Sequence, residues 1–573
     1  MDLFKKNLLN MHSQNKIRLT ELYLDKILKI ENEEKQRKEY IYKELKFFFS
    51  GINYKYPEKM VLHISIPKKF LFSKLEKLTN LPIEHYLLKY IGSKINEYNY
   101  SNYNRNKDVR EKPYIEAQTT NDIIIKRNGI RFDKNTQSFI LNLFFRFPLI
   151  NNHAIIAKSS YKFVKEILEI IHSECINFDS NYHIIKLINI YDQQQYIRLY
   201  LKKYGYISFI ANDSILPRKD GSTKQNENAV KFKSPIENEI EILFSDGSKI
   251  KGMGLKKGII VITGGGYSGK STILDAIQFG IYNHEFKDGR EFCITDESAF
   301  KIVSEDGRYI SNMNLSAFFK YIGNEKNVKK FSTDHASGSV SQAANILDAI
   351  SMNCKLMLFD EDRSAINFMI KDDIMREIIL DEAIIPFIDR IQEIYERFNI
   401  SFILVIGGSS AYIKYSTEVL LMDKYVLTNI TSLCKNISFT NSFSEIIKGT
   451  YKHIRTLSQE KPNDFIYYNI VKNENSKYIQ IGDYKANITY LSSIISDYQI
   501  NYLVYIIMFI LSRNEYYEKN LYLLLKNTKK NLSSEIIEDF FIDSNMDKIL
   551  WLEEVKNNDI FSTINRLRGL VIK

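Results

Sequence analysis

A glycine-rich loop directly after an apolar strand constrains this chain more than any other feature. The run Ile259 to Thr263 reads as a buried strand, and residues 264–271 then spell GGGYSGKS. This matches the pattern G-x-x-x-x-G-K-S/T, and a helical pattern of apolar residues follows it. Glycines let such a loop wrap tightly, so that its backbone N–H groups and the positive end of the next helix face one point. The order strand, loop, helix therefore predicts an α/β domain with an anion site at one edge of its sheet.

The residues of this glycine loop indicate that the anion is a nucleotide phosphate. Lys270 would reach the β- and γ-phosphates, and the hydroxyl of Ser271 would bind Mg²⁺. We therefore expect ATP with Mg²⁺ at this loop. The predicted nucleotide-binding residues are Gly264, Gly265, Gly266, Tyr267, Ser268, Gly269, Lys270, Ser271 and Thr272.

A second apolar strand ends in two carboxylates, because residues 355–361 read KLMLFDE. A P-loop needs an acidic residue at the end of a neighbouring strand. We expect Asp360 to hold Mg²⁺ together with Ser271, and Glu361 to orient and deprotonate the attacking water. The alternative for Glu361 is a solvated surface acid. The predicted catalytic residues are thus Glu361 and Lys270.

Between these two motifs, residues 336–342 read ASGSVSQ, and a helical pattern rich in small residues follows. This segment resembles the signature loop of ABC ATPases, in which small residues and a helix N-terminus meet the γ-phosphate of a nucleotide bound to another protomer. The corresponding residues are Ser337, Gly338, Ser339 and Gln342. Taken alone, Ser-Gly-Ser is more typical of an ordinary loop. One glycine loop and one signature loop per chain predict a head-to-tail homodimer.

Length and composition are those of a multidomain globular protein. The chain has 573 residues, 44% of them hydrophobic and 26% charged, and a chain of this length exceeds the usual size of one hydrophobic core. The net charge of +10 permits a polyanionic partner such as RNA. The chain is also enriched in Lys, Asn, Ile and Tyr from end to end. A/T-rich coding would produce that enrichment without any such partner.

Cysteine spacing and hydropathy indicate the cellular compartment in which we expect the protein. The four cysteines show neither a disulfide framework nor the spacing of a zinc site, which favours a reducing compartment. They are Cys175, Cys293, Cys354 and Cys434. The longest apolar run, Tyr502 to Leu511, is about half the roughly 20 residues that span a bilayer, so we expect a buried helix there. No export signal is evident, and we expect no membrane insertion and a cytoplasmic location, with an organellar matrix as the alternative.

Pattern and composition predict four segments. Residues 1–35 form a charged helical extension, residues 36–204 an N-terminal α+β domain, residues 205–435 the ATPase domain, and residues 436–573 a small C-terminal α+β domain. The turn-rich stretch 212–235 is interpreted as a boundary loop. The expected fold class is α/β, with an ABC-type P-loop core around a mainly parallel sheet.

Taken together, these residues resemble a predicted ABC-class ATPase family, which includes a member related to a mitochondrial RNA-binding complex. The similarity is strong over residues 205–435 and weak in the flanks. It rests on residues 213–218, 252–254, the glycine loop, 282–284, 288–291, 305–308, 334–342, 360–362, 364–365, 367–369, 386–390, 407–409 and 564–568. The resemblance implies a family-specific N-terminal domain, a small C-terminal domain and RNA binding by some members. Ser268 stands where many members have histidine.

Compared with ordinary ABC ATPases, the chain lacks two expected side chains. The strand Phe402 to Ile406 is followed by Gly407, Gly408, Ser409 and Ser410 where a switch histidine would contact the γ-phosphate. No glutamine for a Q-loop is evident either, so we expect slow turnover. Ser409 or Ser410 could replace the histidine, although serine in a glycine-rich turn is more often a turn residue.

Several basic residues allow two interpretations, phosphate binding and an ordinary structural or surface role. His284 and Arg290 follow the helix after the glycine loop, and Arg290 could pair with phosphate or serve a helix end. Three basic clusters could contact RNA, although solvated charge is the commoner explanation. They are Lys251, Lys256 and Lys257; Lys326, Lys329 and Lys330; and Arg566 and Arg568.

Two functions follow from these observations. The first is an ATPase whose dimer closes and opens on ATP and thereby binds or remodels RNA or a ribonucleoprotein. The alternative is an RNA-binding scaffold that uses ATP as a structural ligand with little turnover. A transporter subunit is less favoured because large additional segments flank the ATPase domain.

Overall fold

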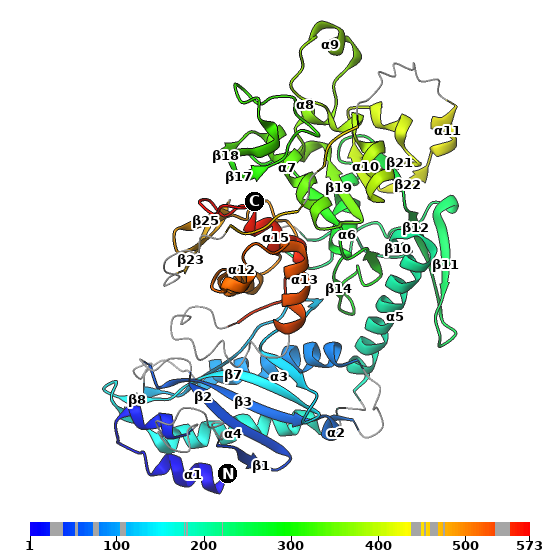
Figure 1. Ribbon diagram of the computed structural model, residues 1–573. Coiled ribbons are helices and arrows are strands. Elements are labelled where there is room, and N and C mark those ends of the chain that lie inside the picture. The colour runs from blue at the N-terminus through cyan, green and yellow to red at the C-terminus, as the bar shows by residue number, and fades with distance from the viewer. Residues whose placement is uncertain are drawn as a thin grey trace. The chain divides into compact units, whose positions relative to one another are not determined.

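The structure is a computed structural model of the chain (Figure 1). It describes residues 1–22, 38–51, 56–72, 79–102, 111–176, 178, 181–219, 222–436, 448–451, 454–458, 468–473, 476–532 and 551–573. The chain divides into two compact units. Unit 1 consists of Met1–Asp192 and Asn531–Glu554, and unit 2 of Gln193–Lys530 and Val555–Lys573.

Unit 1 is an antiparallel sheet covered by helices. Its main sheet has the order β1-β2-β3-β7-β4, with β6 also paired to β7. The strands are β1 (Tyr40–Tyr42), β2 (Leu45–Gly51), β3 (Lys59–Pro67), β4 (Tyr114–Ala117), β5 (Ile123–Ile124), β6 (Ile130–Asp133), β7 (Ser138–Arg146), β8 (Leu149–Ile150) and β9 (Ala154–Ile155). The helices are α1 (Asp2–Leu9), α2 (Lys68–Leu71), α3 (Asn80–Asn102), α4 (Ala157–Cys175) and the long α5 (Tyr182–Tyr204), which continues into unit 2.

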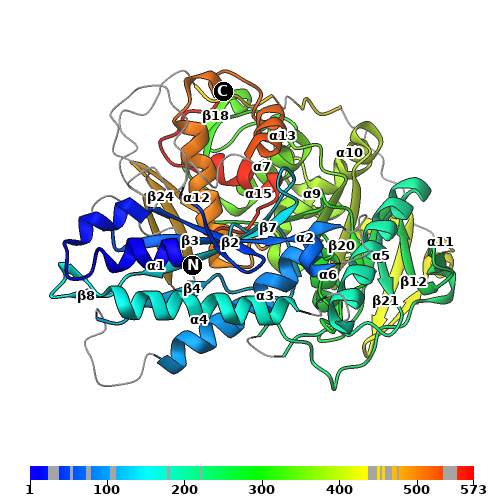
Figure 2. The ribbon, with the colours of Figure 1, turned by 90° about the horizontal axis from the view of Figure 1, so that it is seen from below.

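Alternation along these strands builds the core of unit 1. Phe47 and Phe49 of β2 share one hydrophobic cluster with residues of α1, α3 and α4, since every second side chain of a strand faces the same side. Figure 2 shows these helices beside the sheet. Phe4 and Leu8 of α1 are fully buried in this cluster. The described part of the predicted N-terminal extension, residues 1–22, is therefore packed into unit 1, and the rest of it lies outside the described residues.

Unit 2 contains a parallel sheet and a smaller antiparallel one. The six-stranded sheet has the order β16-β19-β20-β13-β21-β22, and only β22 runs antiparallel to its neighbour. Its strands are β13 (Ile259–Thr263), β16 (Phe300–Ile302), β19 (Leu356–Asp360), β20 (Ser401–Ile406), β21 (Glu418–Asp423) and β22 (Val426–Asn429). The antiparallel sheet β11-β12-β10-β15 consists of β10 (Tyr206–Ala211), β11 (Glu239–Leu243), β12 (Lys249–Lys256) and β15 (Cys293–Thr295).

The parallel strands are near-continuous apolar runs because both faces of such a sheet are covered. All residues of β19 and β20 are buried. Helix α6 contacts β19 and β20, and α7 contacts β16. The helices of this part are α6 (Lys270–Phe279), α7 (Gly338–Ser351), α8 (Ile366–Met369), α9 (Asp373–Ile378), α10 (Ile391–Phe398) and α11 (Thr431–Lys435). The predicted ABC-type core with a mainly parallel sheet is confirmed.

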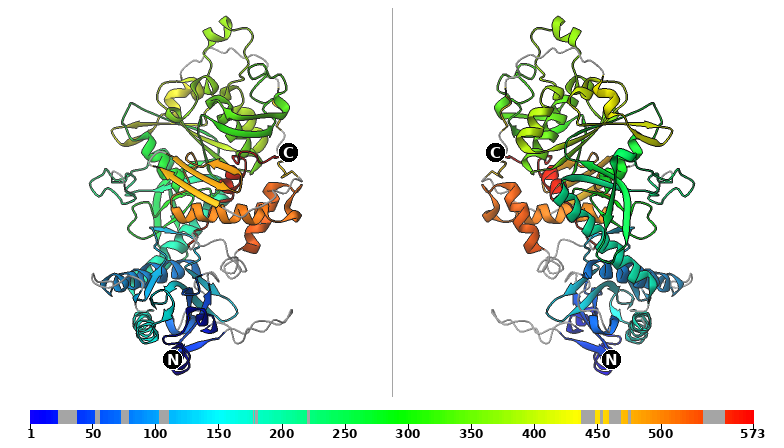
Figure 3. Two further views of the ribbon diagram at one scale, coloured as in Figure 1. Left: turned by 90° about the vertical axis from the view of Figure 1, so that its left-hand side faces the viewer. Right: turned by 90° about the vertical axis from the view of Figure 1, so that its right-hand side faces the viewer.

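Two further groups of strands belong to unit 2. β17 (Arg308–Met313) pairs with β18 (Phe331–Ala336), and β14 (Asn283–His284) follows α6. The C-terminal region adds the sheet β23 (Tyr468–Asn473), β24 (Ser476–Ile481) and β25 (Tyr484–Asn487), with helices α12 (Asp497–Leu511), α13 (Leu521–Leu532) and α15 (Asn557–Ile564). Helix α12 contacts β24, and Figure 3 shows this orange helix beside the strands of that sheet.

The C-terminal elements are α and β as expected, yet they share unit 2 with the glycine loop. Gln278 of α6 donates a hydrogen bond to Ser492 Oγ at 2.8 Å, and Tyr282 Oη donates to the carbonyl of Ser493 at 2.9 Å. The stretch 212–235 also lies inside unit 2, because a loop rich in turn residues can fold back on one core without separating two. Its Asp213 N–H donates to the carbonyl of Phe232 at 2.8 Å.

The apolar run from Tyr502 to Leu511 lies in α12 and is largely buried, as predicted. Over the described residues, no helix combines the length and apolar character needed to cross a membrane.

Candidate active site

The predicted site residues lie at one edge of the parallel sheet. Strand β20 lies between β13 and β19, and the register pairs Thr263 with Ile406 and Asp360 with Val405. The carboxyl ends of the three strands are therefore level. Because hydrogen-bonded strands are about 4.8 Å apart, the glycine loop after β13 and the carboxylates after β19 are separated by a single strand. Ligands of open parallel sheets bind at this edge.

Two glycines of the loop occupy conformations that other residues rarely adopt. Gly264 has φ +147°, and a Cβ there would lie 2.1 Å from the carbonyl oxygen of Met422. Gly269 has φ +105° and caps the N-terminus of α6. Both values fall in the region that favours glycine. The backbone conformation thus requires the two glycines of the sequence pattern. At both positions the loop lies against residues at the turn between β21 and β22.

Lys270 reaches back over the glycine loop from the start of α6. Its Nζ donates to the carbonyl oxygens of Gly264 at 2.8 Å and Gly265 at 2.6 Å. The ammonium is therefore held above the loop, where phosphate oxygens would meet it. Gly265 and Gly266 have open space around their Cα atoms, which leaves that side of the loop accessible.

The other loop residues differ in exposure. Tyr267 has φ +58° and a fully exposed side chain, so only its backbone can face the loop interior. Ser271 is exposed and Thr272 half-buried. The hydroxyl of Ser268 is buried and has no hydrogen-bond partner among the described residues. An unpaired buried hydroxyl is costly, and a phosphate oxygen is the kind of group that would satisfy it.

Glu361 is held by the loop after β20. Its Oε2 accepts the backbone N–H of Gly407 at 2.6 Å and of Gly408 at 2.8 Å. A Cβ on Gly407 would lie 3.7 Å from both Glu361 Oε2 and Lys270 Nζ. The structure therefore brings the two predicted catalytic residues close together, Lys270 from the start of α6 and Glu361 from the loop after β19. The carboxylate is fixed in place, unlike a freely solvated surface acid.

Asp360 and Ser271 offer a donor set that suits Mg²⁺. Asp360 ends β19 and is 6% exposed. Burial raises the pKa of Asp360 above its ordinary value, and the nearby carboxylates of Asp362 and Asp275 add to the rise, against the opposing charge of Lys301. A bound cation would relieve this. Mg²⁺ in nucleotide sites takes one or two protein oxygens and completes its shell with phosphate and water, so one carboxylate and one hydroxyl suffice.

The signature residues lie at the start of α7, with Ser337 as its N-cap, and are tied to the loop that carries Glu361. Ser337 is exposed and N-terminal to the helix. Ser339 Oγ donates to Asn367 Oδ1 at 2.9 Å, and Gln342 Oε1 accepts the N–H of Ala365 at 2.8 Å. The side chains of Ser339 and Gln342 are thus buried within the protomer, and Ser337 is the exposed residue at the start of the helix.

Residues 407 and 408 were not assigned a role from the sequence. Their backbone N–H groups hold Glu361, whereas Ser409 Oγ accepts the N–H of Ala411 at 3.2 Å, as a turn residue does. Two consecutive glycines directly after an apolar strand were the available signal, because backbone donors are best presented where side chains are absent.

Arg290 does not lie at the nucleotide edge, contrary to one of the readings above. It is 4% exposed, and its Nε donates to the carbonyl of Leu216 at 2.8 Å. Nearby, His284 Nδ1 lies 2.7 Å from Asp288 Oδ2, which also pairs with Arg218 Nη2 at 2.8 Å. These contacts fix the stretch 212–235 to the rest of unit 2.

Arg566 is likewise unavailable to RNA. It is 3% exposed and forms an ion pair with Glu305, since the segment after α15 folds against α7. The reading of Arg566 as an RNA contact is therefore wrong. Lys251 pairs with Glu239 and Glu241 at 3.8 and 3.7 Å. Lys326, Lys329 and Lys330 are exposed.

A cavity of about 650 Å³ lies at the opposite, amino edge of the sheet. It is lined by residues that precede the strands, including Lys257 before β13, Lys355 before β19 and Asn399 before β20. The glycine loop and the acidic pair lie at the carboxyl edge, so this cavity is separate from the candidate nucleotide site.

Comparison with known proteins places the site within a family. A model of the P-loop domain of ABC ATPases matches residues 180–456. The uncharacterized protein MJ1628 of Methanocaldococcus jannaschii is 36% identical over 222 residues, which cover 36% of this chain and 49% of that protein. The chain thus spans about half the length of this curated relative.

Two solved structures are also similar. One is cbiO1 from Clostridium perfringens, part of the ABC transporter complex cbiONQ, with a TM-score of 0.23, 14% identity, and coverage of 39% of this chain and 87% of that one. The other is MJ1267, an ATP-binding cassette of an ABC transporter in its ADP conformation, with a TM-score of 0.24, 13% identity, and coverage of 40% and 94%. By the match of the family model, residues 180–456 form a P-loop domain of the ABC ATPase family.

Proposed function

We propose that this protein binds Mg-ATP at the glycine loop and hydrolyses it, with Glu361 as the general base. The ABC-type P-loop domain supports ATP binding. The observation that carries hydrolysis is the position of Glu361, whose carboxylate is fixed by two backbone N–H groups close to Lys270 Nζ. A general base must be held within reach of the water from which it takes a proton.

Each residue has one role in this proposal. Lys270 binds the β- and γ-phosphates, as the loop lysine of P-loop enzymes does. Ser271 and Asp360 would hold Mg²⁺, which neutralises phosphate charge when bound. Both N–H bonds end on Oε2 of Glu361, and Oε1 is thereby left to accept a proton from water. We propose slow turnover, since the loop after β20 supplies glycines where a histidine would otherwise reach the γ-phosphate.

Steady-state hydrolysis tests the enzymatic proposal. Wild type is compared with Glu361→Gln and, as a matched control, with Glu237→Gln, which removes an exposed carboxylate elsewhere in unit 2. We expect Glu361→Gln to lose about 100-fold or more in kcat, the contribution typical of a general base, and Glu237→Gln to stay close to wild type. Equal, near-zero rates in wild type and Glu361→Gln would rule hydrolysis out.

We further propose that two copies of the chain form a head-to-tail dimer around two nucleotides. The exposed Ser337 at the N-terminus of α7 would face the γ-phosphate of the partner's ATP. Mass measurement in solution with Glu361→Gln and ATP should give a dimer. Ser337→Arg in that background should give a monomer, and the exposed control Asn324→Arg a dimer. A monomer in all three cases would contradict the proposal.

RNA or a ribonucleoprotein is the partner that we propose, supported by the net charge of +10 and by the exposed Lys326, Lys329 and Lys330. Replacing all three by alanine should weaken binding of single-stranded RNA and reduce its salt dependence, with the triple Lys251, Lys256 and Lys257 as comparison. Unchanged affinity in both triples would remove the support. If RNA retention needs Lys270 but not Glu361, the scaffold function is favoured over the ATPase.

A further inference from the structure

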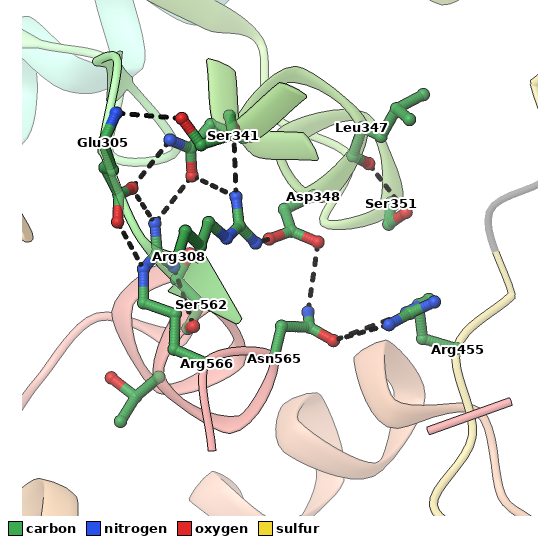
Figure 4. Close-up of polar contacts among 12 residues, drawn as sticks. Glu305, Arg308, Ser341, Leu347, Asp348, Ser351, Arg455, Ser562, Asn565 and Arg566 are labelled. Atoms are coloured by element: carbon green, nitrogen blue, oxygen red, sulfur yellow. Dashed lines mark hydrogen bonds and ion pairs between the residues drawn. The ribbon is translucent and has the colours of Figure 1, made fainter. Parts of the chain in front are cut away.

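A cluster of charged and amide side chains is buried where α7 meets the C-terminal segment of unit 2 (Figure 4). We name it the buried charge cluster and define it as Glu305, Arg308, Asn345, Asp348 and Arg566. All five residues are at most 4% exposed. Charged residues are almost never buried to this extent unless they are paired, so the contacts within the cluster must compensate the charges.

Glu305 and Arg566 form the centre of the cluster. Glu305 Oε2 accepts Arg566 Nε at 3.1 Å, and Glu305 Oε1 accepts the second guanidinium nitrogen of Arg566. The contact is the two-pronged kind that guanidinium and carboxylate groups form best. Asn345 of α7 donates to Glu305 Oε1 at 2.8 Å and accepts from Arg566 at 2.6 Å. Residue 566 is thus joined directly to a side chain of α7.

The second ion pair binds the same helix. Arg308 of β17 pairs with Asp348 of α7 and donates to Asn345 Oδ1 at 2.6 Å. Asp348 also accepts the side-chain amide of Asn565 at 3.1 Å. Figure 4 shows residues from α7, β17 and the segment after α15 converging on this point.

From Glu305 the contacts continue to the signature loop. The N–H of Glu305 donates to Ser341 Oγ at 2.9 Å, and that hydroxyl donates to the carbonyl of Gly338 at 2.9 Å. A Cβ on Gly338 would lie 2.3 Å from Ser304 Oγ, so Ser304, two residues after β16, packs directly on the signature loop. The position of residues 304 and 305 therefore sets the position of Gly338.

The same segment reaches the loop that carries Glu361. The N–H of Ser304 donates to the carbonyl of Arg363 at 2.8 Å, two residues beyond Glu361. Residues 304 and 305 thus contact both the signature loop and the loop that carries Glu361. The side chain of Glu305 is in turn held by Arg566.

The charges of the central pair are retained in the folded protein. Burial would raise the pKa of Glu305, but the charges of Arg566 and Arg308 and the hydrogen bonds from Arg566 and Asn345 outweigh it and hold that pKa below its ordinary value. Loss of Arg566 would leave Glu305 as a buried carboxylate without its main partner. Such a group either gains a proton or moves toward water, and both changes displace residues 304 and 305.

We propose that Arg566 is a positioning residue for ATP hydrolysis, acting through Glu305 to hold the signature loop and the loop of Glu361 in register. The C-terminal segment after α15 thereby completes the nucleotide site without touching the nucleotide. This inference rests on the proposed function, since it concerns the same site.

The test compares full-length Arg566→Met with a control that breaks a similarly buried ion pair elsewhere. Arg127→Met serves as this control, because Arg127 pairs with Glu553 at 2.6 Å inside unit 1 and both side chains are 1% exposed. A double variant, Glu305→Gln with Arg566→Gln, removes both charges and so avoids an unpaired carboxylate. It keeps the test available should Arg566→Met not fold.

Two readouts separate positioning from general destabilisation. In Arg566→Met and in the double variant we expect kcat to fall about tenfold or more while KM for ATP stays within about twofold, because the glycine loop is held by β13 and α6. Arg127→Met should match wild type in both constants. A folded Arg566 variant with the wild-type kcat, or one whose loss of activity Arg127→Met reproduces, overturns the proposal.

Amide hydrogen exchange gives a readout that does not need activity. Residues 337–342 and 361–365 should exchange faster in the Arg566 variants, with residues 264–272 unchanged. If wild type hydrolyses no ATP, the proposed function fails while this exchange pattern still tests the inference. Uniform exchange changes, or none in the two loops, would refute the inference even for an active enzyme.

Discussion

The glycine loop and the buried charge cluster belong to the same unit but hold their charges in opposite ways. The loop is one continuous run of residues at the sheet edge, with Lys270 bonded to backbone carbonyls and open space beside Gly265. The cluster collects residues 305, 308, 345, 348 and 566 from separate segments and buries them. The loop is organised to receive a ligand, whereas the cluster compensates its own charges. Variants in the two regions should therefore fail differently. Loop variants should lose ATP binding, whereas cluster variants should lose folding stability and, through the positioning role proposed for Arg566, kcat.

The largest effect is expected from breaking the second ion pair of the cluster. Arg308→Met leaves Asp348 buried without its main partner, which costs about 3–5 kcal/mol of folding stability. The paired replacement Arg308→Met with Asp348→Leu should cost less, because no unpaired charge remains. Chemical denaturation monitored by circular dichroism measures both. Equal stability of wild type and Arg308→Met would show that the cluster does not hold unit 2 together.

The glycine loop should show the reverse behaviour. Lys270→Ala removes a charge that is held over the loop but not buried, so we expect the midpoint of unfolding to change little and the affinity for ATP to fall about 100-fold, the scale of charge-assisted hydrogen bonds. Anisotropy of a fluorescent ATP analogue measures this. Lys424→Ala, which removes an exposed lysine from the β21–β22 turn, is the control. Equal losses in both variants would argue against a specific role for Lys270.

A pH series tests whether buried charge outside the cluster also contributes to stability. Burial would raise the pKa of Asp288, but His284 and Arg218 outweigh it and lower that pKa to about 2, from an ordinary value of 3.8. The stabilisation is therefore fully present above about pH 4 and is lost as the pH falls toward 2. It is on the order of 2 kcal/mol.

The stability difference between wild type and Asp288→Asn should accordingly shrink by about that amount between pH 4 and pH 2. Urea unfolding at each pH measures it, and the exposed Asp334→Asn serves as the control. A difference that is constant with pH would show that Asp288 is not held as the structure indicates.

The smallest effect concerns the backbone that holds Glu361. A Cβ on Gly408 would lie 3.2 Å from Glu361 Oε1, whereas a Cβ on Gly407 would meet Glu361 at 3.7 Å, an ordinary contact. We expect Gly408→Ala to lower kcat by up to about tenfold, which is about 1.4 kcal/mol, and Gly407→Ala to change it less. Steady-state kinetics of the two alanine variants measures both losses of kcat. A larger loss in Gly407→Ala than in Gly408→Ala would contradict this prediction.

The contrast also explains what could be predicted from the sequence. The strand Ile259 to Thr263, the glycine loop and the acidic end of β19 lie in short runs whose chemistry is readable locally, and the structure has them where expected. The role of Arg566 was not readable, because its partner Glu305 is remote in sequence and a basic pair near the C-terminus looks the same whether it is exposed or buried. The glycines that hold Glu361 act through backbone N–H groups, which every residue but proline possesses.

The composition of a loop is a weak guide to its place in the fold for a related reason. The stretch 212–235 has the composition of a linker, yet hydrogen bonds such as that from Asp213 to Phe232 fold it back on unit 2. The C-terminal segment joins unit 2 through buried polar contacts, and hydrophobic periodicity carries no signal for such contacts.

The measurement that tests the central claim most directly is single-turnover hydrolysis with enzyme in excess over ATP and Mg²⁺ present, comparing wild type with Glu361→Gln. We predict that wild type converts bound ATP to ADP in a single exponential phase, and that Glu361→Gln retains the nucleotide as ATP over the same period. Conversion at the same rate by both proteins, or by neither, would contradict the assignment of Glu361 as the base.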